Sequence, residues 1–305
     1  NNEILKQRLS CIPIHIKEFD NITNLEVHVN CENNSKDIQW VTTEHFEIYD
    51  TLKDEYLKQK EKEKIFPKNS ITGSYIDFVR LRPKITDDIH GEHIQFIAKM
   101  SVSNAKHDSM FNVVCNSSYG FTIDQNKADK AWNIKMKQLE EEGLDQDQIV
   151  FAKKDWDLLE AKRYYKENSY DFTIESVGVY TAKEIVVKAC DILLKDFEEF
   201  KDIINKDYDD IVSISPANIK NSYDIRLNDK DNTFGRIIEY MLYKEYFDKG
   251  LITFCGFKIF HPHDTFGIIR LGFEKEVDDT IIKDMFQKSC NKIKNILEEI
   301  KKMLE

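Results

Sequence analysis

The chain has 305 residues, of which 41% are hydrophobic and 32% charged, and its formal net charge is −11. This length fits one large domain or two to three small ones, and the acidic balance argues against a free-standing nucleic-acid binder, which usually carries a basic stripe. No apolar run approaches the roughly 20 residues that a transmembrane helix needs, and the first residues do not have the pattern of a signal peptide.

The cysteines stand singly and form no Cys-x-x-Cys pair, so the sequence does not predict a zinc ribbon. Several lie in apolar segments, where we expect buried free thiols. A disulfide framework is not expected in a chain this long, and a reducing compartment fits best. The six cysteines are Cys11, Cys31, Cys115, Cys190, Cys255 and Cys290.

The first half of the chain alternates polar and apolar residues over short stretches, which indicates strands. Residues 2–10 resemble the end of a helix, and residues 51–64 are almost all charged, which predicts a solvated helix or a mobile loop. Between residues 124 and 166 we expect two helices, around 128–142 and 156–165. The expected extended segments are 11–16, 21–50, 76–81, 94–102, 110–121 and 170–179.

A long amphipathic helix follows. Thr181 is a good N-cap, and Glu184 three residues later completes a capping box. Apolar residues then recur in steps of mostly three and four, which puts one stripe on one face. The stripe comprises Ile185, Val186, Ala189, Leu193, Phe197, Phe200 and Ile204. The acidic stretch 205–210 predicts a linker.

The last hundred residues indicate a second module. Short strands are expected at 211–214 and 223–227, and a helix at 233–247, capped by Asn232 or Thr233 and followed by Gly250. Two further strands, 251–260 and 266–273, precede a final helix that begins near residue 278. Its heptad seam comprises Phe286, Ser289, Ile293, Ile296, Ile300 and Met303. Strands followed by a long helix thus occur twice, and each apolar stripe needs a partner.

The second module resembles the eleventh subunit of eukaryotic RNA polymerase II and its archaeal counterpart. That family's pattern is Asp-His-Thr-x-Gly-Asn-Leu-Leu, followed by Gly-Tyr and His-Pro. The matching residues are Asp231, Thr233, Gly235, Gly256, His261 and Pro262. The chain departs from the pattern at Asn232, Arg236, Ile237 and Ile238.

The earlier part resembles the third subunit of the same polymerase, its archaeal counterpart and the bacterial alpha subunit. The similar segments occur in the family's order. The first is a helix end followed by a strand, with Arg8, Leu9, Ile12, Pro13 and Ile14, and the second is a loop with Ala105, Lys106 and His107. The return strand 171–178 and the closing helix 181–194 complete the resemblance. One chain carrying both parts looks like the fused subunit of large cytoplasmic DNA viruses. The resemblance also implies a strand and a helix upstream of residue 1.

The resemblance implies an α+β fold in which two dimerisation domains pack as a pseudo-dimer, with a mostly β insert. The implied domains are residues 1–17 with 106–204, the insert 18–105, and residues 210–305. It implies a non-catalytic assembly platform of a DNA-directed RNA polymerase, without a cofactor. The implied partners are the two largest subunits and a small tenth-subunit-like protein, with DNA reached only through the complex. The implied location is the virion or the host cytoplasm.

The expected seam between the two domains consists of apolar residues on four helical segments. They are Ile185, Ala189, Leu193, Phe197, Phe234, Ile238, Met241, Phe286, Ile293, Ile296 and Ile300.

Two other classes of function remain open on the residues alone. The terminal helices could serve a stand-alone adaptor that binds an unrelated helical protein. His90, His93 and His107 could be metal ligands, although Gly91 argues against a regular helical pair and a fourth ligand is not evident. A solvated loop is the simpler interpretation, and a turn is the simpler one for His261 and His263.

The remaining chemical motifs have structural explanations. Asp229 and Asp231 could form a carboxylate pair for acid–base chemistry, but their position before a helix favours an interaction with its free N–H groups. Ser101, Ser109 and Ser117 lack the Gly-x-Ser-x-Gly context of a hydrolase.

Overall fold

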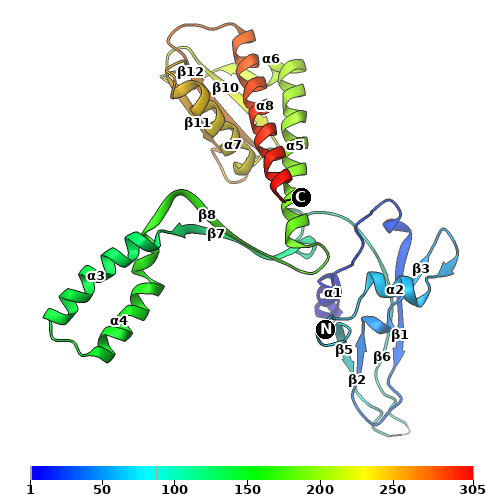
Figure 1. Ribbon diagram of the computed structural model, residues 1–305. Helices are drawn as coiled ribbons and strands as arrows, with labels where there is room; N and C mark the ends of the chain where they lie inside the picture. The colour runs from blue at the N-terminus through cyan, green and yellow to red at the C-terminus, as the bar shows by residue number, and fades with distance from the viewer. Residues whose placement is uncertain (1, 87, 305) are drawn as a thin grey trace. The chain divides into compact units, whose positions relative to one another are not determined.

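The computed structural model describes residues 2–86 and 88–304, which divide into two compact units (Figure 1). The first unit is Asn1–Ala182 and the second is Lys183–Glu305. Both contain helices and antiparallel strands, so the expected α+β class is confirmed. Among the described residues, no helix combines the length and the apolar character needed to cross a bilayer.

The first unit is built around an antiparallel sheet in the order β4-β3-β1-β6. Val27 on β1 pairs with Ile48 on β3, and Val29 pairs with Phe96 on β6, so one face of the sheet is apolar and buried. A second pair, β2-β5, adds Val41 and Phe78 to the same core. The strands are β1 (Leu25–Glu32), β2 (Gln39–Thr42), β3 (Glu47–Asp50), β4 (Glu55–Tyr56), β5 (Asp77–Leu81) and β6 (His93–Lys99).

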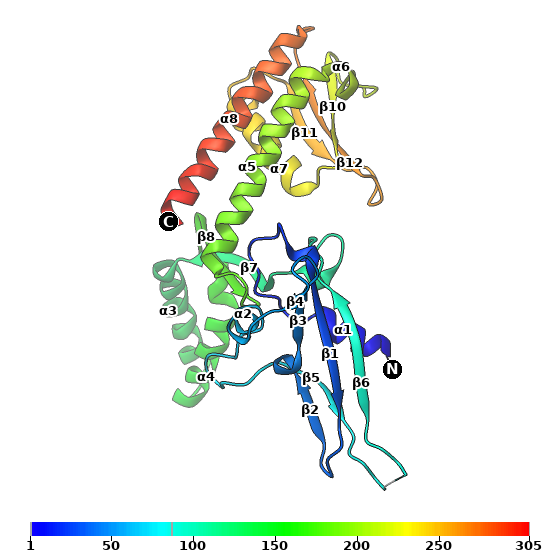
Figure 2. The ribbon, with the colours of Figure 1, turned by 90° about the vertical axis from the view of Figure 1, so that its right-hand side faces the viewer.

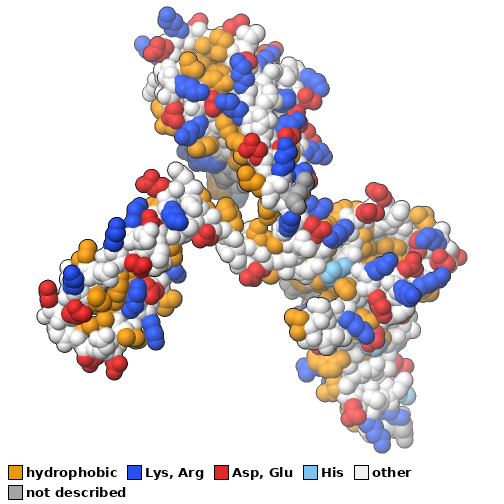
Figure 3. Space-filling model, viewed as in Figure 1, with side chains coloured by type: hydrophobic (Ala, Val, Ile, Leu, Met, Phe, Trp, Pro, Cys, Tyr) orange, Lys and Arg blue, Asp and Glu red, His pale blue; other side chains and the backbone are white. Residues whose placement is uncertain are grey.

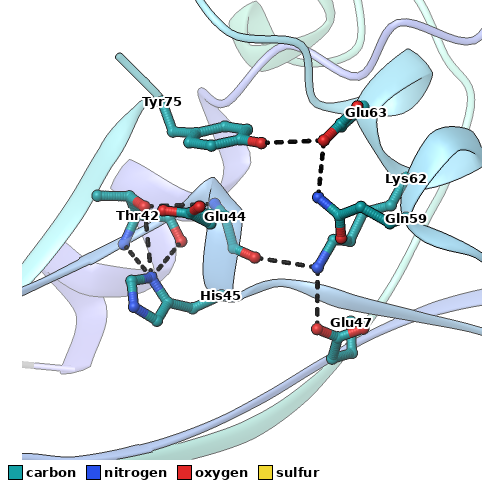
Figure 4. Close-up of polar contacts among 8 residues, drawn as sticks. All are labelled: Thr42, Glu44, His45, Glu47, Gln59, Lys62, Glu63 and Tyr75. Atoms are coloured by element: carbon teal, nitrogen blue, oxygen red, sulfur yellow. Dashed lines mark hydrogen bonds and ion pairs between the residues drawn. The ribbon is translucent and has the colours of Figure 1, made fainter.

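The charged segment near residue 60 is more ordered than its composition suggests. It contains α2 (Gln59–Ile65), in which Lys62 is only 6% exposed. The Lys62 ammonium donates to the Glu44 carbonyl at 3.0 Å and to the Glu47 carboxylate at 2.9 Å (Figure 4). A buried charge is costly unless it is paired, so these bonds hold α2 against the turn η2 (Thr43–His45) and β3.

The described part of the segment 1–17, residues 2–17, was expected in a different domain from the insert but packs on the insert's core. Helix α1 (Asn2–Ser10) contributes two of the partly buried side chains, and the following extended segment contributes the others. These are Leu5, Leu9, Ile12, Ile14 and Ile16. A 3-10 turn, η1 (Ile22–Asn24), then leads into β1.

The rest of the first unit is a two-stranded ribbon with a helical hairpin between its strands (Figure 1). Trp132 and Trp156 pack in a small separate core between the two helices. The second helix begins earlier than expected, because Asp145 and Gln148 form a capping box at its start. The elements are η3 (Ser109–Phe111), β7 (Val114–Ile123), α3 (Gln125–Glu141), α4 (Gln146–Leu158), η4 (Glu160–Arg163) and β8 (Tyr165–Ser176).

The outside of the helical hairpin carries several apolar side chains, seen as orange patches in Figure 3. Phe151 and Leu158 on α4 are 67% and 62% exposed. They do not contribute to the core between the helices.

The second unit is a four-stranded antiparallel sheet in the order β11-β12-β10-β9, with α5, α7 and α8 on one side of it (Figure 2). Buried residues of the sheet and of all three helices form one continuous hydrophobic core. The elements are α5 (Ala182–Lys206), α6 (Tyr208–Ile211), β9 (Val212–Ile214), β10 (Ser222–Asn228), α7 (Asn232–Leu242), the π-helical turn η5 (Tyr243–Phe247), β11 (Phe254–Lys258), β12 (Phe266–Gly272) and α8 (Asp279–Leu304).

The division into units differs from the expected domain boundary near residue 205. Helix α5 belongs to the second unit, because its buried residues Phe197, Phe200 and Ile204 join the core of that unit. The expected linker contains the end of α5 and the short helix α6. Membership of a core depends on contacts that are distant in sequence, and a local composition signal does not reveal them.

Candidate functional site

The turn before α7 is a helix cap. The Asp231 carboxylate accepts hydrogen bonds from the backbone N–H groups of Thr233 at 3.0 Å and Phe234 at 3.2 Å. These N–H groups have no partner inside the helix, so the carboxylate stabilises its first turn. Asp229 adopts a positive φ of 54° in the preceding turn. The Asp231 carboxylate therefore starts α7, whereas Asp229 contributes to the turn through its backbone, whose N–H donates to the Thr265 carbonyl at 2.8 Å.

Gly235 allows α7 to approach the sheet closely. A Cβ atom at this position would lie 2.2 Å from the Phe257 ring, and one at Gly267 on β12 would lie 2.4 Å from the same ring. The ring is thus held between helix and sheet, where it is 4% exposed. On the same helix, the Glu239 carboxylate accepts from the Phe257 backbone N–H at 2.8 Å. The motif from Asp231 to Gly235 therefore fixes the position of α7.

Helices α5 and α8 run antiparallel in a constant register. Their flanks are joined by polar pairs, and each step along α5 is matched by an equal step back along α8. The pairs are Asp191 with Lys301, Glu198 with Lys294 at 3.0 Å, Lys201 with Asn291 at 3.0 Å, and Asn205 with Gln287. Such pairs at the edge of a helical interface set the register and orientation of the two helices.

Aromatic side chains fill the space between the three helices. Phe197 of α5 stacks on Phe234 of α7 with ring centroids 4.3 Å apart. Phe200 meets Phe234 edge-on at 5.4 Å and Phe286 of α8 at 5.7 Å. Aromatic pairs of this kind contribute about 0.5–1.5 kcal/mol each beyond their area burial. This cluster joins α5 to α7 and α8.

Charged residues surround the aromatic cluster. Lys230, before α7, pairs with Asp196 of α5 at 2.6 Å. The Glu245 carboxylate accepts from Lys249 and Lys292, and these two ammonium groups lower its pKa to about 2. The Glu245–Lys292 pair therefore ties η5 to α8.

The thiols in this unit are not poised for reaction. Burial raises the pKa of Cys290 to about 12 and also that of Cys255 to about 12. Both therefore remain protonated near neutral pH, and a reactive cysteine requires the thiolate.

Most of the predicted seam residues come together in this core. The buried ones are Phe197, Phe234, Ile238, Met241, Phe286 and Ile293, and Leu193 packs against them while partly buried. Ile185 is half-buried and lies outside the cluster, and Ala189 is exposed.

On α8 the predicted seam departs from the structure. Ile296 and Ile300 are 47% and 38% exposed, whereas Leu297 is buried. A strict seven-residue pattern assumes 3.5 residues per turn, and a helix with 3.6 drifts away from it. The buried positions of α8 follow that drift; they include Ile282, Phe286, Cys290, Ile293 and Leu297. Leu297, which the sequence places beside the seam, belongs to the core in the structure.

The histidines are dispersed. His93 shares a hydrogen bond of 2.6 Å with Asn30, and His107 stacks on Phe111. His261 accepts from the His263 backbone N–H at 3.1 Å, as in a turn. In residues 2–86 and 88–304, the structure contains no group of three or more potential ligands placed to hold a metal ion. The structure therefore does not bring His90, His93 and His107 together as a metal centre.

The second unit contains a segment that matches a known family. Residues 222–303 match the model of the RNA polymerase Rpb3/Rpb11 dimerisation domain. No curated protein matches the chain. The matched segment runs from β10 to α8 and excludes α5. The resemblance of the second module to this class of polymerase subunit is therefore confirmed, whereas that of the earlier part to the third subunit stays a prediction.

Proposed function

We propose that this chain is a non-catalytic assembly platform of a multisubunit DNA-directed RNA polymerase, and that it supplies both halves of the third- and eleventh-subunit pair. The observation that carries this proposal is the position of α5. This helix precedes the matched dimerisation domain in sequence, yet it packs along α8 and inserts Phe197 and Phe200 between α7 and α8. If the two subunits were fused, a helix from the earlier half would cover the helices of the later dimerisation domain. The position of α5 agrees with this expectation.

The proposed mechanism is burial of apolar surface. Interfaces of obligate complexes commonly bury about 2,000–5,000 Å² and are more hydrophobic than the average protein surface. Joining the two halves in one chain raises their effective concentration and fixes their stoichiometry. The proposed pseudo-dimer would then present its remaining surface to other subunits.

The proposed partners are the two largest polymerase subunits and a small tenth-subunit-like protein. The net charge of −11 fits a chain that reaches DNA only through its complex. No cofactor is needed for this role. We further propose that the chain is a viral fused subunit that acts in the virion or the host cytoplasm, a reducing environment that suits six free cysteines.

The native mass of the complex tests this function. The full chain, co-expressed with the two largest subunits of its source, should purify with both and run as a species of their combined mass. A chain that purifies alone, or with a single small helical protein, would favour the adaptor instead. The isolated chain should polymerise no nucleotides, and activity in a pure preparation would contradict the proposal.

A further inference from the structure

The sheet of the second unit has two unlike faces. Ile225 and Ile269 point inward and are fully buried beneath the helices. Successive side chains of a strand point to opposite faces of the sheet, so the neighbours of Ile225 and Ile269 lie on the side opposite to α5, α7 and α8, which cover one side of the sheet (Figure 2). The register aligns Arg226 with Ile268 and Ile268 with Lys258. We call the outward side the open face; its central residues are Asp224, Arg226, Phe254, Lys258, Phe266, Ile268 and Arg270.

One charge on the open face is already neutralised. The Arg270 guanidinium donates to both Asp224 carboxylate oxygens, at 2.6 and 2.7 Å. The Asp224 side chain is 9% exposed. This bidentate pair joins β10 to β12, and the pKa of Arg270 is raised by the Asp224 carboxylate. The pair therefore adds no net charge to the face.

Two further cations on the open face rest on aromatic rings. The Arg226 guanidinium lies 3.8 Å from the centre of the Phe266 ring, and the Lys258 ammonium lies 5.0 Å from that of Phe260. Both Arg226 and Lys258 are exposed. Within the described part of the chain, neither forms an ion pair with a carboxylate. In a chain with a net charge of −11, these two cations lie on either side of Ile268 in the strand register.

The two edges of the sheet are less accessible to a partner polypeptide than the open face. β9 has only three residues, and a short edge strand offers few groups for pairing. At the other edge, the Phe257 N–H is already bonded to Glu239. A partner that added a strand would need free groups along one of these edges. The open face is therefore the more suitable surface for docking.

We infer that the open face binds an acidic polypeptide segment with an aromatic or aliphatic side chain between its carboxylates. The carboxylates would pair with Arg226 and Lys258, and the apolar side chain would lie on Ile268 and Phe266. This inference rests on the proposed function and assigns the segment to one of the two largest polymerase subunits. A nucleic acid is disfavoured, because phosphate backbones are bound by extended basic stripes and this face offers two free cations beside Asp224.

The inference is tested with the full chain bound to the two co-expressed largest subunits. The double variant Arg226→Glu/Lys258→Glu reverses both charges at exposed positions, so the fold should persist by circular dichroism. The matched control, Lys195→Glu/Lys288→Glu, reverses two exposed lysines on the outer sides of α5 and α8. We expect the first variant to bind at least about tenfold more weakly and the control to bind within about twofold of wild type. The difference in affinity between wild type and the Arg226→Glu/Lys258→Glu variant should become smaller as the salt concentration rises, because salt screens the charges.

A photocrosslink identifies the occupant. A benzophenone-bearing residue in place of Ile268 should crosslink to an acidic segment of a largest subunit, mapped by mass spectrometry. Crosslinks to nucleic acid, or to the first unit of the same chain, would overturn the inference, as would wild-type affinity in the Arg226→Glu/Lys258→Glu variant. If the wild-type chain bound neither largest subunit, the proposed function itself would fail. These outcomes separate the two failures.

Discussion

Gly235 illustrates the constraints on single residues in this interface. Its position on α7 faces the Phe257 ring, and a methyl group there would overlap the ring unless helix or ring moved. The signature Asp231–Gly235 therefore encodes a cap followed by a close contact, two functions that lie within one helical turn. Both are structural contacts that position α7.

We predict that Gly235→Ala destabilises the second unit. Alanine is a better helix former than glycine by about 1 kcal/mol, but the overpacking against Phe257 should cost about 1–3 kcal/mol and outweigh that gain. All three tryptophans, Trp40, Trp132 and Trp156, lie in the first unit. Tryptophan fluorescence therefore reports on the first unit, and its urea midpoint should stay unchanged. The urea midpoint of the second unit, followed by circular dichroism, should fall.

Gly120→Ala is the matched control for this experiment. A Cβ atom at Gly120 would meet nothing within 4 Å, so the variant should unfold within about 0.5 kcal/mol of wild type. Equal stability of Gly235→Ala and wild type would show that the close contact between α7 and Phe257 is not as described.

A second residue-scale prediction concerns pH. The pKa of Glu245 is lowered to about 2 by Lys249 and Lys292. A carboxyl group with a depressed folded pKa stabilises the fold above its unfolded pKa of about 4.3, and this contribution is lost as pH falls toward 2. Glu245→Gln should therefore unfold at lower urea concentration than wild type near pH 7, and the two midpoints should converge near pH 2. A difference that persisted unchanged at pH 2 would contradict the assigned ion pairs.

At the scale of the elements, the sequence was most informative where apolar residues recur in steps of three and four, as they do in α5, α7 and α8. The cap of α7 differs from the prediction, because Asp231 and not Asn232 or Thr233 accepts from the free N–H groups of the first turn. The start of α4 was missed because its cap, Asp145, lies in a uniformly polar stretch. The register between α5 and α8 could not be predicted, because its polar pairs join residues that are 82 to 110 positions apart.

The exposed fraction of each apolar side chain shows which of them belong to the core of the second unit. Phe200 of α5 is 3% exposed and touches both Phe234 and Phe286. Phe200→Ala should lower the free energy of unfolding of the second unit by about 3–5 kcal/mol, because it removes a large buried side chain and leaves a cavity. Thermal unfolding followed by circular dichroism measures the loss. Phe260→Ala, at a position that is 56% exposed, is the control and should change stability far less; similar losses in both variants would contradict the assigned core.

At the scale of the whole molecule, the chain joins two units with separate cores. The sequence predicted two dimerisation domains and an insert, and put the boundary between the two dimerisation domains after α5, because the acidic stretch near residue 207 resembles a linker. The structure groups α5 with the later strands and helices, since core membership outweighs position along the chain. Assembly should therefore depend on the α5–α8 seam more than on any single surface residue.

The most direct test of this account compares Ile293→Asp with Ile296→Asp. Both change isoleucine to aspartate on α8, but Ile293 is 2% exposed and Ile296 is 47% exposed. A buried unpaired carboxylate is costly, so Ile293→Asp should disrupt the seam. Native mass spectrometry of the full chain co-expressed with the two largest subunits should show no complex for Ile293→Asp and normal complex for Ile296→Asp. Normal assembly of Ile293→Asp would contradict the central claim.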